Sequence, residues 1–511
     1  MNVYLKRLKK RMTGSQKSHF FHPAVLLLLG LITAQVIATI QVYLSNLNLY
    51  AAVKVITDTG YLAVPNQNIM PKLKEFAPAF YGGIFFSLSI GAGISLASLA
   101  AAWTWDRILV RNKHVLILYL LFWLGLILFL IASGFSLFVT LYILAIPLIV
   151  FWATIKILSK RSQPDNNRYF LIHLIPVVVL AIFWSTQYDR YLFLDLRDYL
   201  LFSNPIGKKV TDFYYTYTLY AAEAFKSLNQ KTLKTCRLTN FSEKNLARLI
   251  ERKLIYFDYL PVDTDESIDL KIIQSSDYLV FENHGRKILK ITANDFLSKT
   301  RVTLNRFSRQ TDRFVNFRKL TFLCVVFGYP LTLYILFHAL FWVITRLFVD
   351  YRKAAVISSI VCLVISLLIL VAFLLSRSPK IEEHELTKNL NSDRWQTRVS
   401  ALRFIEEKKI EISQLKDYSK IATSLHIPER YWFVKVLANS REPETFGAIL
   451  ELLNDSNINV VSMAYSALAQ RKDPRAVKEI LERIKISDNW YSQLYAYKAL
   501  RALGWRQKRL R

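Results

Sequence analysis

Acidic residues gather between positions 258 and 269 of this 511-residue chain, in a pattern that could do proton-transfer or metal chemistry. They are Asp258, Asp263, Asp265, Glu266 and Asp269. Two carboxylates held close together can share a proton, and several together can bind Ca²⁺ through their oxygens. Their spacing does not match an EF-hand loop. We therefore expect a solvated acidic loop and assign no catalytic residue and no metal ligand. The alternative is an enzyme or carrier for a lipid-linked or envelope substrate.

Two histidines, His173 and His338, lie in apolar stretches. Imidazoles that face each other at one depth in a membrane can ligate haem iron, so a haem-binding redox subunit is a second alternative. Separate, hydrogen-bonded histidines are the commoner arrangement, and we assign no cofactor. The three cysteines cannot form a disulfide framework or a zinc site, and Ser-His-Asp, Cys-His and glycine-rich phosphate motifs are missing from the sequence.

The composition indicates a membrane protein. Hydrophobic residues make up 53% of the chain and aromatic residues 14%, which is too apolar for a soluble protein of this length. The formal charge of +29 could suggest nucleic-acid binding, but membrane proteins accumulate Lys and Arg at their helix ends. Because no nucleic-acid module accompanies the charge, a nucleic-acid partner is not expected.

The fold class that we predict is a polytopic α-helical membrane protein with about seven spans, a small extracytoplasmic α+β domain and a C-terminal α-solenoid. A spanning helix needs about 20 mostly apolar residues. Seven blocks qualify: 23–44, 77–102, 115–133, 135–157, 169–187, 319–345 and 354–375. The domains expected are a basic N-terminus (1–22), five spans (23–187), the α+β domain (188–318), a two-span hairpin (319–375), a linker (376–390) and the solenoid (391–511).

The basic residues predict an orientation. Lys and Arg cluster in segments 6–17, 107–113, 160–168 and 346–353, which seven spans place on one side. The positive-inside rule makes that side cytoplasmic, so both soluble domains should lie outside the cytoplasmic (inner) membrane. One observation opposes this assignment: Arg306, Arg309, Arg313, Arg318 and Lys319 crowd the outer end of the sixth span.

A tyrosine-rich helix is expected at 208–228. Tyrosine concentrates at the membrane–water boundary, so we expect this helix on the outer leaflet or on the tops of the spans, with membrane lipid as a partner. An aromatic core face of the next domain and a carbohydrate or lipid site are the alternatives. The interfacial residues expected are Tyr214, Tyr215, Tyr217 and Tyr220.

Small residues recur at intervals of four in the second span, at Gly83, Ser87, Gly91 and Ser95. Such a ridge permits close helix packing and could serve an oligomer interface. In the middle domain, the sequence predicts helices at 242–253 and 294–318, and strands at 254–259, 269–273, 278–281 and 287–291. The last two strands should be joined by a turn at Asn283-His284-Gly285.

The C-terminal region contains a repeated helix pattern. Four segments ending at Leu402, Leu437, Leu468 and Leu500 align, with intervals of 35, 31 and 32 residues, and we expect these leucines in the repeat core. Second helices lie between them, one of which starts at Asp473-Pro474.

The third repeat, with Asp455, Ala464 and Asp473-Pro474, resembles HEAT-like repeats of the phycobilisome-lyase type. This resemblance implies a surface for protein partners and no particular reaction. The function predicted from the sequence is therefore that of a membrane-anchored scaffold or adaptor, rather than an enzyme, that docks an unknown protein partner at the outer face of the membrane.

Overall fold

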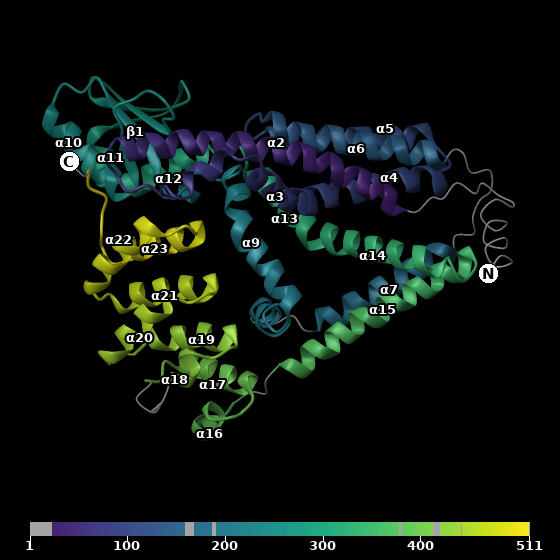
Figure 1. Cartoon of the computed structure of the whole chain (residues 1–511). Coiled ribbons are helices and arrows are strands. Elements are labelled where there is room, and N and C mark those ends of the chain that lie inside the picture. The colour runs from purple at the N-terminus through teal and green to yellow at the C-terminus, as the bar shows by residue number, and fades with distance from the viewer. Residues whose placement is uncertain are drawn as a thin grey trace. The chain divides into compact units, whose positions relative to one another are not determined.

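A computed structural model describes residues 23–158, 168–186, 191–377, 381–411, 419–440 and 442–509 (Figure 1). The chain divides into two compact units. The first contains residues up to 37, residues 86–182 and residues 316–365. The second contains residues 38–85 and 183–315 together with everything from 366 onward. The basic N-terminal segment, 1–22, lies outside the described residues.

The first unit is built from helices. It holds the first part of α2 (Pro23–Asp58), most of α15 (Tyr351–Ser376), and a set of complete elements. These are the π-turn η2 (Ser87–Gly91), α4 (Ala92–Arg107), α5 (Lys113–Ile131), α6 (Leu137–Leu158) and α14 (Tyr329–Thr345). Two more elements, α13 (Val315–Leu323) and the π-turn η5 (Cys324–Gly328), precede α14, and α7 (Arg168–Ser185) follows α6.

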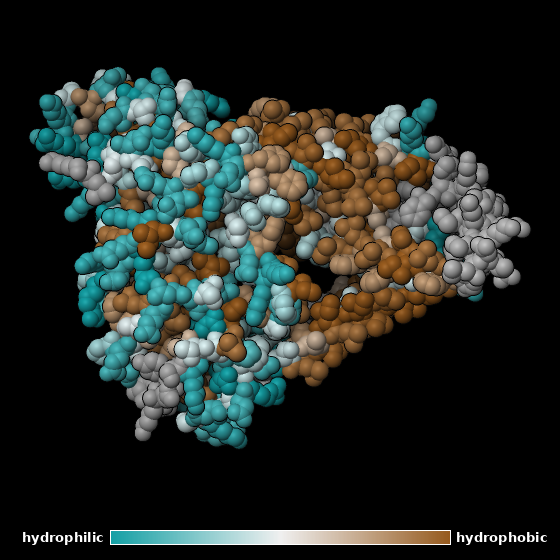
Figure 2. Space-filling view, in the orientation of Figure 1, coloured by the Kyte–Doolittle hydropathy of each residue, from teal (hydrophilic) through white to brown (hydrophobic). Residues whose placement is uncertain are grey.

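Six helical stretches of the described chain are long and apolar enough to cross a membrane. They are Pro23–Asp58, Phe76–Arg107, Lys113–Ile131, Leu137–Leu158, Val315–Thr345 and Lys353–Ser376. They correspond to six of the seven expected blocks, and the remaining block, 169–187, coincides with α7 but is not among the six. Figure 2 shows a mainly hydrophobic surface over α5, α6, α14 and α15.

The small-residue ridge packs within the chain. Ser87 hydrogen-bonds through its Oγ to the side-chain oxygen of Gln35 on α2, at 2.6 Å. A Cβ added to Gly91 would overlap the Cβ of Ala34, and one added to Gly30 would overlap the side chain of Ser95. Three members of the ridge, Ser87, Gly91 and Ser95, thus let η2 and α4 approach α2 closely. Gly83 is buried in α3 (Phe76–Phe86).

The second unit includes a five-stranded sheet with the strand order β2-β1-β3-β4-β5. Its strands are β1 (Lys234–Thr239), β2 (Tyr259–Pro261), β3 (Leu270–Ser275), β4 (Tyr278–Asn283) and β5 (Arg286–Thr292). β1 pairs in parallel with β2 and β3, and the other pairs are antiparallel. Helices α10 (Lys244–Tyr256), α11 (Ala293–Ser298) and α12 (Thr300–Gln310) share its hydrophobic core.

The sheet confirms three expected strands and corrects one. The turn between β4 and β5 is the expected one, with positive φ at His284 and Gly285. The strand expected at 254–259 is wrong, because residues 254–256 form the last turn of α10. Leu254 and Ile255 are compatible with a strand or a helix. They form a helix here because α10 is amphipathic and buries Leu254 together with Ile250 on one face. β1 was not expected. The helix expected at 294–318 is divided into α11, α12 and the start of α13.

The C-terminal part of the second unit is a stack of helices, seen as the green-to-yellow ladder in Figure 1. The first helices of the repeats are α17 (Trp395–Lys408), α19 (Ile427–Leu437), α21 (Ile458–Arg471) and α23 (Trp490–Ala502), and each packs against the next. The second helices are α18 (Ser419–Ala422), α20 (Glu444–Leu452) and α22 (Arg475–Ile486). A short helix, α16 (Leu386–Leu390), precedes them, and its Leu386 and Leu390 belong to the same hydrophobic cluster.

Candidate interaction surfaces of the repeat domain

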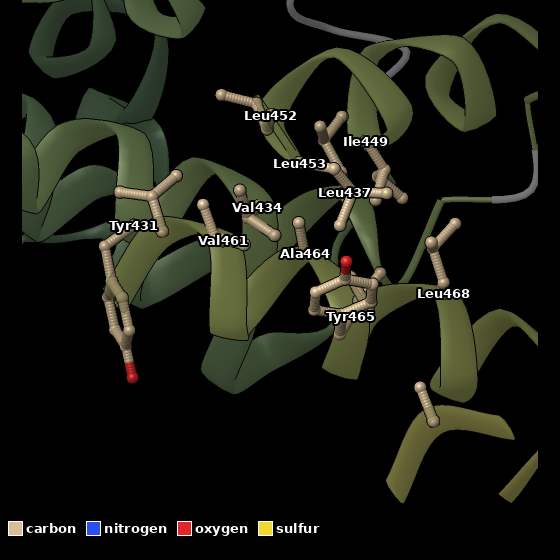
Figure 3. Close-up of a cluster of buried hydrophobic side chains, with 14 of the residues drawn as sticks. Tyr431, Val434, Leu437, Ile449, Leu452, Leu453, Val461, Ala464, Tyr465 and Leu468 are labelled. Atoms are coloured by element: carbon tan, nitrogen blue, oxygen red, sulfur yellow. The ribbon is translucent and has the colours of Figure 1, made fainter. Parts of the chain in front are cut away.

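The repeat core is formed by apolar residues from each pair of helices, as the close-up of α19, α20 and α21 shows (Figure 3). Val434 and Leu437 on α19 meet Ile449 on α20 and Ala464 and Leu468 on α21. Leu402, Leu437, Leu468 and Leu500 are all fully buried in this cluster. Such a stack has a first-helix face and a second-helix face, either of which can carry a binding site.

An arginine contact recurs between repeats. Arg398 on α17 binds Glu429 and the carbonyl of Ser392, and Arg430 on α19 binds Asp455 and the carbonyl of Ser424. Arg398 and Arg430 stand 32 positions apart, the same interval as Leu468 and Leu500. The interval of 35 between Leu402 and Leu437 therefore does not join equivalent positions. Neighbouring Val436 and Leu437 are both fully buried, so burial alone does not set the register.

A cluster of charged residues joins the repeat stack to a segment that precedes the sheet domain in the chain. This segment contains α8 (Leu192–Asp195) and the π-helical turn η3 (Leu196–Leu201). Asp198 is fully buried, and its carboxylate accepts hydrogen bonds from Arg403 of α17 at 2.7 Å and from the Trp432 indole of α19 at 2.8 Å. Arg197 pairs with the other oxygen of Asp198, also at 2.7 Å. We call Asp195, Arg197, Asp198, Arg377, Arg403 and Trp432 the aspartate cluster.

The aspartate cluster also reaches the end of α15, the last apolar helix. Asp195 is nearly fully buried and pairs with Arg403 and, at 2.9 Å, with the Nε of Arg377. Phe373 of α15 lies in the same hydrophobic cluster as the repeats. Each buried carboxylate is thus matched by guanidinium groups from separate parts of the chain, an arrangement that becomes costly when one partner is removed.

A second contact is made by a loop, residues 61–68, that follows α2. The buried Asn66 points its amide nitrogen at the carbonyl oxygens of Ile484, Lys485 and Ser487 at the end of α22, at 2.9, 3.0 and 3.0 Å. Its backbone N–H donates to the side chain of Gln493 on α23 at 2.9 Å. The last repeat therefore receives this loop through directional hydrogen bonds. These bonds also satisfy carbonyl groups at a helix end.

The side chain of Gln507, near the end of the described chain, binds the backbone of the same loop at Leu62. It donates from Nε2 to the carbonyl of Leu62 at 2.7 Å and accepts from the N–H of Leu62 at 3.1 Å. Leu62 is half-buried, and this one glutamine supplies partners for both its backbone N–H and its carbonyl.

The sheet domain makes the third contact. The hydroxyl of Tyr497 on α23 donates to Asp258 at 2.6 Å, and Arg501 pairs with the same carboxylate at 3.0 Å. Burial raises the pKa of Tyr497, and the adjacent Asp258 charge raises it further. Asp258, expected in a solvated acidic loop, instead holds the repeat stack to the sheet domain.

Three other members of the predicted acidic loop also have charged partners, whereas Glu266 is exposed. Asp263 pairs with Arg509 at 3.5 Å, Asp265 pairs with Arg237, and Asp269 pairs with Lys231 at 2.6 Å. The structure does not bring these carboxylates together into one site. Among the described residues, we find no group of three or more His, Cys, Asp or Glu side chains that could hold a metal ion.

The tyrosine-rich helix is α9 (Pro205–Glu223), and its rings contact two different neighbours. Tyr215 and Tyr220 lie edge-on to Tyr491 and Trp490 of α23, at centroid distances of 4.9 and 5.0 Å. Burial raises the pKa of Tyr215 to about 12. Tyr217 packs on Tyr81 of α3 at 4.8 Å. Two of the tyrosines thus cover the repeat stack, a contact that the sequence did not indicate.

The described residues do not show His338 and His173 facing each other. The ring of His338 is buried in α14, with its Nε2 atom 3.3 Å from the carbonyl oxygen of Ala355. The side chain of His173 lies outside the described residues, so a haem held by these two histidines remains an untested hypothesis.

The first-helix face of the repeat stack is therefore occupied by α9, the aspartate cluster and the loop 61–68. The second-helix face is polar and exposed at Glu444 and Glu451 of α20, and at Lys478, Glu482 and Lys485 of α22. These side chains carry both signs of charge, which suits a protein surface of mixed charge. Asn66, Asp195 and Asp198 bind the occupied face through their polar side chains. In the sequence alone, such isolated polar residues cannot be told apart from residues that face solvent.

A comparison with protein families matches residues 418–503 to a model described as HEAT repeats. This match covers the helices from α18 to α23 and confirms the resemblance found in the sequence. Comparisons with curated proteins and with solved structures gave no match. The repeats indicate a helical scaffold with a role in protein interaction.

Proposed function

We propose that this protein is a membrane-anchored HEAT-repeat scaffold that docks a protein partner at the outer face of the cytoplasmic membrane. The anchoring is supported by six apolar helices of sufficient length, and the outer-face placement counts the 18-residue α7 as a seventh span. The docking is supported by the HEAT repeats, because stacked repeats expose an extended surface that neighbouring repeats hold in shape.

The single observation that carries the proposal is the division of the repeat surface. Its first-helix face is covered by residues of the same chain, including Tyr215, Asp198 and Asn66. Its second-helix face carries exposed residues on α20 and α22. A scaffold needs one face fixed and another free, so we place the partner on α20 and α22.

The tyrosine-rich helix supports anchoring near the membrane surface. In α9, the rings of Phe213 and Tyr217 contact the ring of Tyr81 in α3, edge-on and tilted respectively, and α3 begins the apolar stretch Phe76–Arg107. The backbone of Ala221 approaches so closely that a Cβ on Gly82 would lie 3.3 Å from its nitrogen. Aromatic rings at the end of an apolar helix are typical of the headgroup level.

Site-directed photocrosslinking tests the partner surface. A photoreactive amino acid at Lys478 or Glu482 on α22 should yield a reproducible adduct with one protein in intact cells. The same amino acid at Asp277, which is exposed on the β3–β4 turn, serves as the control. The proposal fails if Asp277 captures the same protein equally well, or if neither position on α22 captures one.

Cysteine labelling tests the orientation separately. The variant K478C should react with a membrane-impermeant maleimide added to intact cells, because position 478 is exposed and the proposed topology places it outside the membrane. The native cysteines Cys236, Cys324 and Cys362 are buried and should add little background labelling. Labelling that requires membrane permeabilisation would place the repeats inside the cell and contradict the proposed topology.

A further inference from the structure

Helix α12 packs on the sheet with one side and exposes arginine side chains on the other. Leu304 and Phe307 are buried against the sheet, with Thr300, Thr303 and Ser308 beside them. Arg301, Arg306 and Arg309 are exposed on the other side. With a rotation of about 100° per residue, these three fall within an arc of about 140°. One side of α12 is therefore fixed by packing while the other carries three cations, which we call the arginine face.

The arginine face has no counter-charge in the described structure. None of the three guanidinium groups forms an ion pair or a hydrogen bond with another described side chain. This contrasts with Arg398, Arg403 and Arg430, which all bind carboxylates. Cations at one face with no protein partner favour an anionic ligand from outside the chain.

The position of α12 in the sequence indicates which anion. Only four residues separate Gln310, the end of α12, from Val315, where a 31-residue apolar stretch suited to crossing a membrane begins. From Lys299 to Lys319 the chain has seven basic residues and one acidic residue, Asp312. A basic cluster that directly precedes a membrane helix in the chain lies within reach of lipid phosphates, where each cation contributes to binding.

We propose that the arginine face of α12 binds the phosphate groups of anionic phospholipids in the bilayer that holds the adjoining helix. This inference rests on the proposed membrane anchoring. Guanidinium groups suit the task because their planar donors pair with two phosphate oxygens at once. Binding of lipid here would hold the sheet domain, and the repeats attached to it through Asp258, close to the membrane surface.

The same domain offers a matched control on α10. Lys244, Arg248 and Arg252 recur once per turn on its exposed side, and they too lack described partners. These three residues carry the same total charge as the arginine face, but α10 leads into β2 and not into an apolar helix. Any effect of net charge alone should therefore appear equally in variants of either helix.

The experiment uses the full-length protein in detergent and measures fluorescence anisotropy of a tail-labelled phosphatidylglycerol. The matching phosphatidylcholine is the zwitterionic probe. The wild type should bind phosphatidylglycerol at least about tenfold more tightly, since three surface cations act on the phosphate. The variant R301Q/R306Q/R309Q should lose this preference, and K244Q/R248Q/R252Q should keep most of it.

Three outcomes would overturn the inference. The α12 variant could keep both the preference and its affinity for inorganic polyphosphate, both variants could lose the preference equally, or the α12 variant could lose affinity for inorganic polyphosphate while its lipid preference stays unchanged. The last outcome would assign the arginine face to a water-soluble polyanion. The substituted residues are all exposed, and circular dichroism would verify that each variant is folded.

Membrane fractionation separates this inference from the proposed function. The α12 variant should remain in the membrane fraction, because its apolar helices are unchanged. A wild-type protein that is absent from the membrane fraction would refute the anchoring itself. A membrane-resident wild type without a phosphatidylglycerol preference would refute only the role of α12.

Discussion

The indole nitrogen of Trp432 donates a 2.8 Å hydrogen bond to the carboxylate of Asp198, which lies 234 positions earlier in the chain. Asp198 also binds Arg403, whose guanidinium lies over the Trp432 ring with its central carbon 4.7 Å from the centroid. One aspartate before the sheet domain thus contacts two repeat helices, α17 and α19.

Replacing Asp198 by asparagine should strongly destabilise the second unit. The substitution removes a charge that neutralises Arg197 and Arg403 in a buried site, and breaking such a cluster costs about 3–5 kcal/mol. Denaturant unfolding followed by tryptophan fluorescence would measure the change in the free energy of unfolding. Asp212, exposed on α9, provides the control, and D212N should have little effect. Equal stabilities for the two variants would contradict this role of the cluster.

Replacing Asn66 by alanine should loosen the last repeat. The carbonyl groups of Ile484 and Lys485 would lose this donor, and unsatisfied buried groups cost about 1–3 kcal/mol, whereas Ser487 would still accept a hydrogen bond from Gln493. Limited proteolysis should then cut near α22 more readily. Asn68 donates to Ile486 at the exposed edge of the same contact, so N68A should change stability by less than about 0.5 kcal/mol. Similar proteolysis of both variants would argue against a specific role for Asn66.

These contacts show which features a sequence can supply. The repeat helices and the β4–β5 hairpin were expected, because caps such as Asp473-Pro474 and turns such as Asn283-His284-Gly285 act over a few residues. The docking of the repeats was not expected, because it depends on polar side chains that are far apart in sequence. Asn66 and Asp198 follow no periodic pattern, and only the folded chain gives them buried partners.

Replacing Gly93 by alanine should disturb the first unit. A Cβ at this position would overlap the side chain of Cys324 on the π-turn η5, and overpacking costs about 1–3 kcal/mol. Gly125 on α5 has no atom within 4 Å of the same position, so G125A should be neutral or stabilise the helix by up to about 1 kcal/mol. Thermal unfolding in detergent would compare the two. A G93A protein as stable as G125A would show that the helices can separate at little cost.

His426 should make the repeat stack sensitive to mild acid. Partial desolvation lowers the pKa of His426, an exposed imidazole, below its ordinary value; Glu429 opposes this shift, and the positive charges of Arg398, Lys208 and Arg430 assist it. The unfolded chain therefore binds a proton more readily than the folded chain, so stability falls as the pH drops below about 6.5. Unfolding experiments between pH 7 and pH 5 would measure this slope. H426Q should reduce the slope, and a slope that H426Q leaves unchanged would contradict this role of His426.

Cys236 should be inert in the folded protein. It is fully buried in the sheet, and this burial raises the pKa of its thiol well above the ordinary value. Because the thiolate is the reactive form, a water-soluble maleimide should leave Cys236 unmodified until the protein unfolds. Peptide mass spectrometry would quantify the modification. Rapid labelling under native conditions would mean that β1 opens frequently.

The hydrogen bond between Asn66 and Gln493 joins residues 427 positions apart, which sets an order for assembly in the cell. A ribosome adds about 5–20 residues per second, so roughly 20–85 s pass between synthesis of the loop after α2 and synthesis of its partner. During that time, the apolar residues Val53, Ile56 and Tyr61 lack the repeat core that later encloses them. The nascent protein therefore has a long interval in which a chaperone can bind, and a chain that terminates before α23 never completes its second unit.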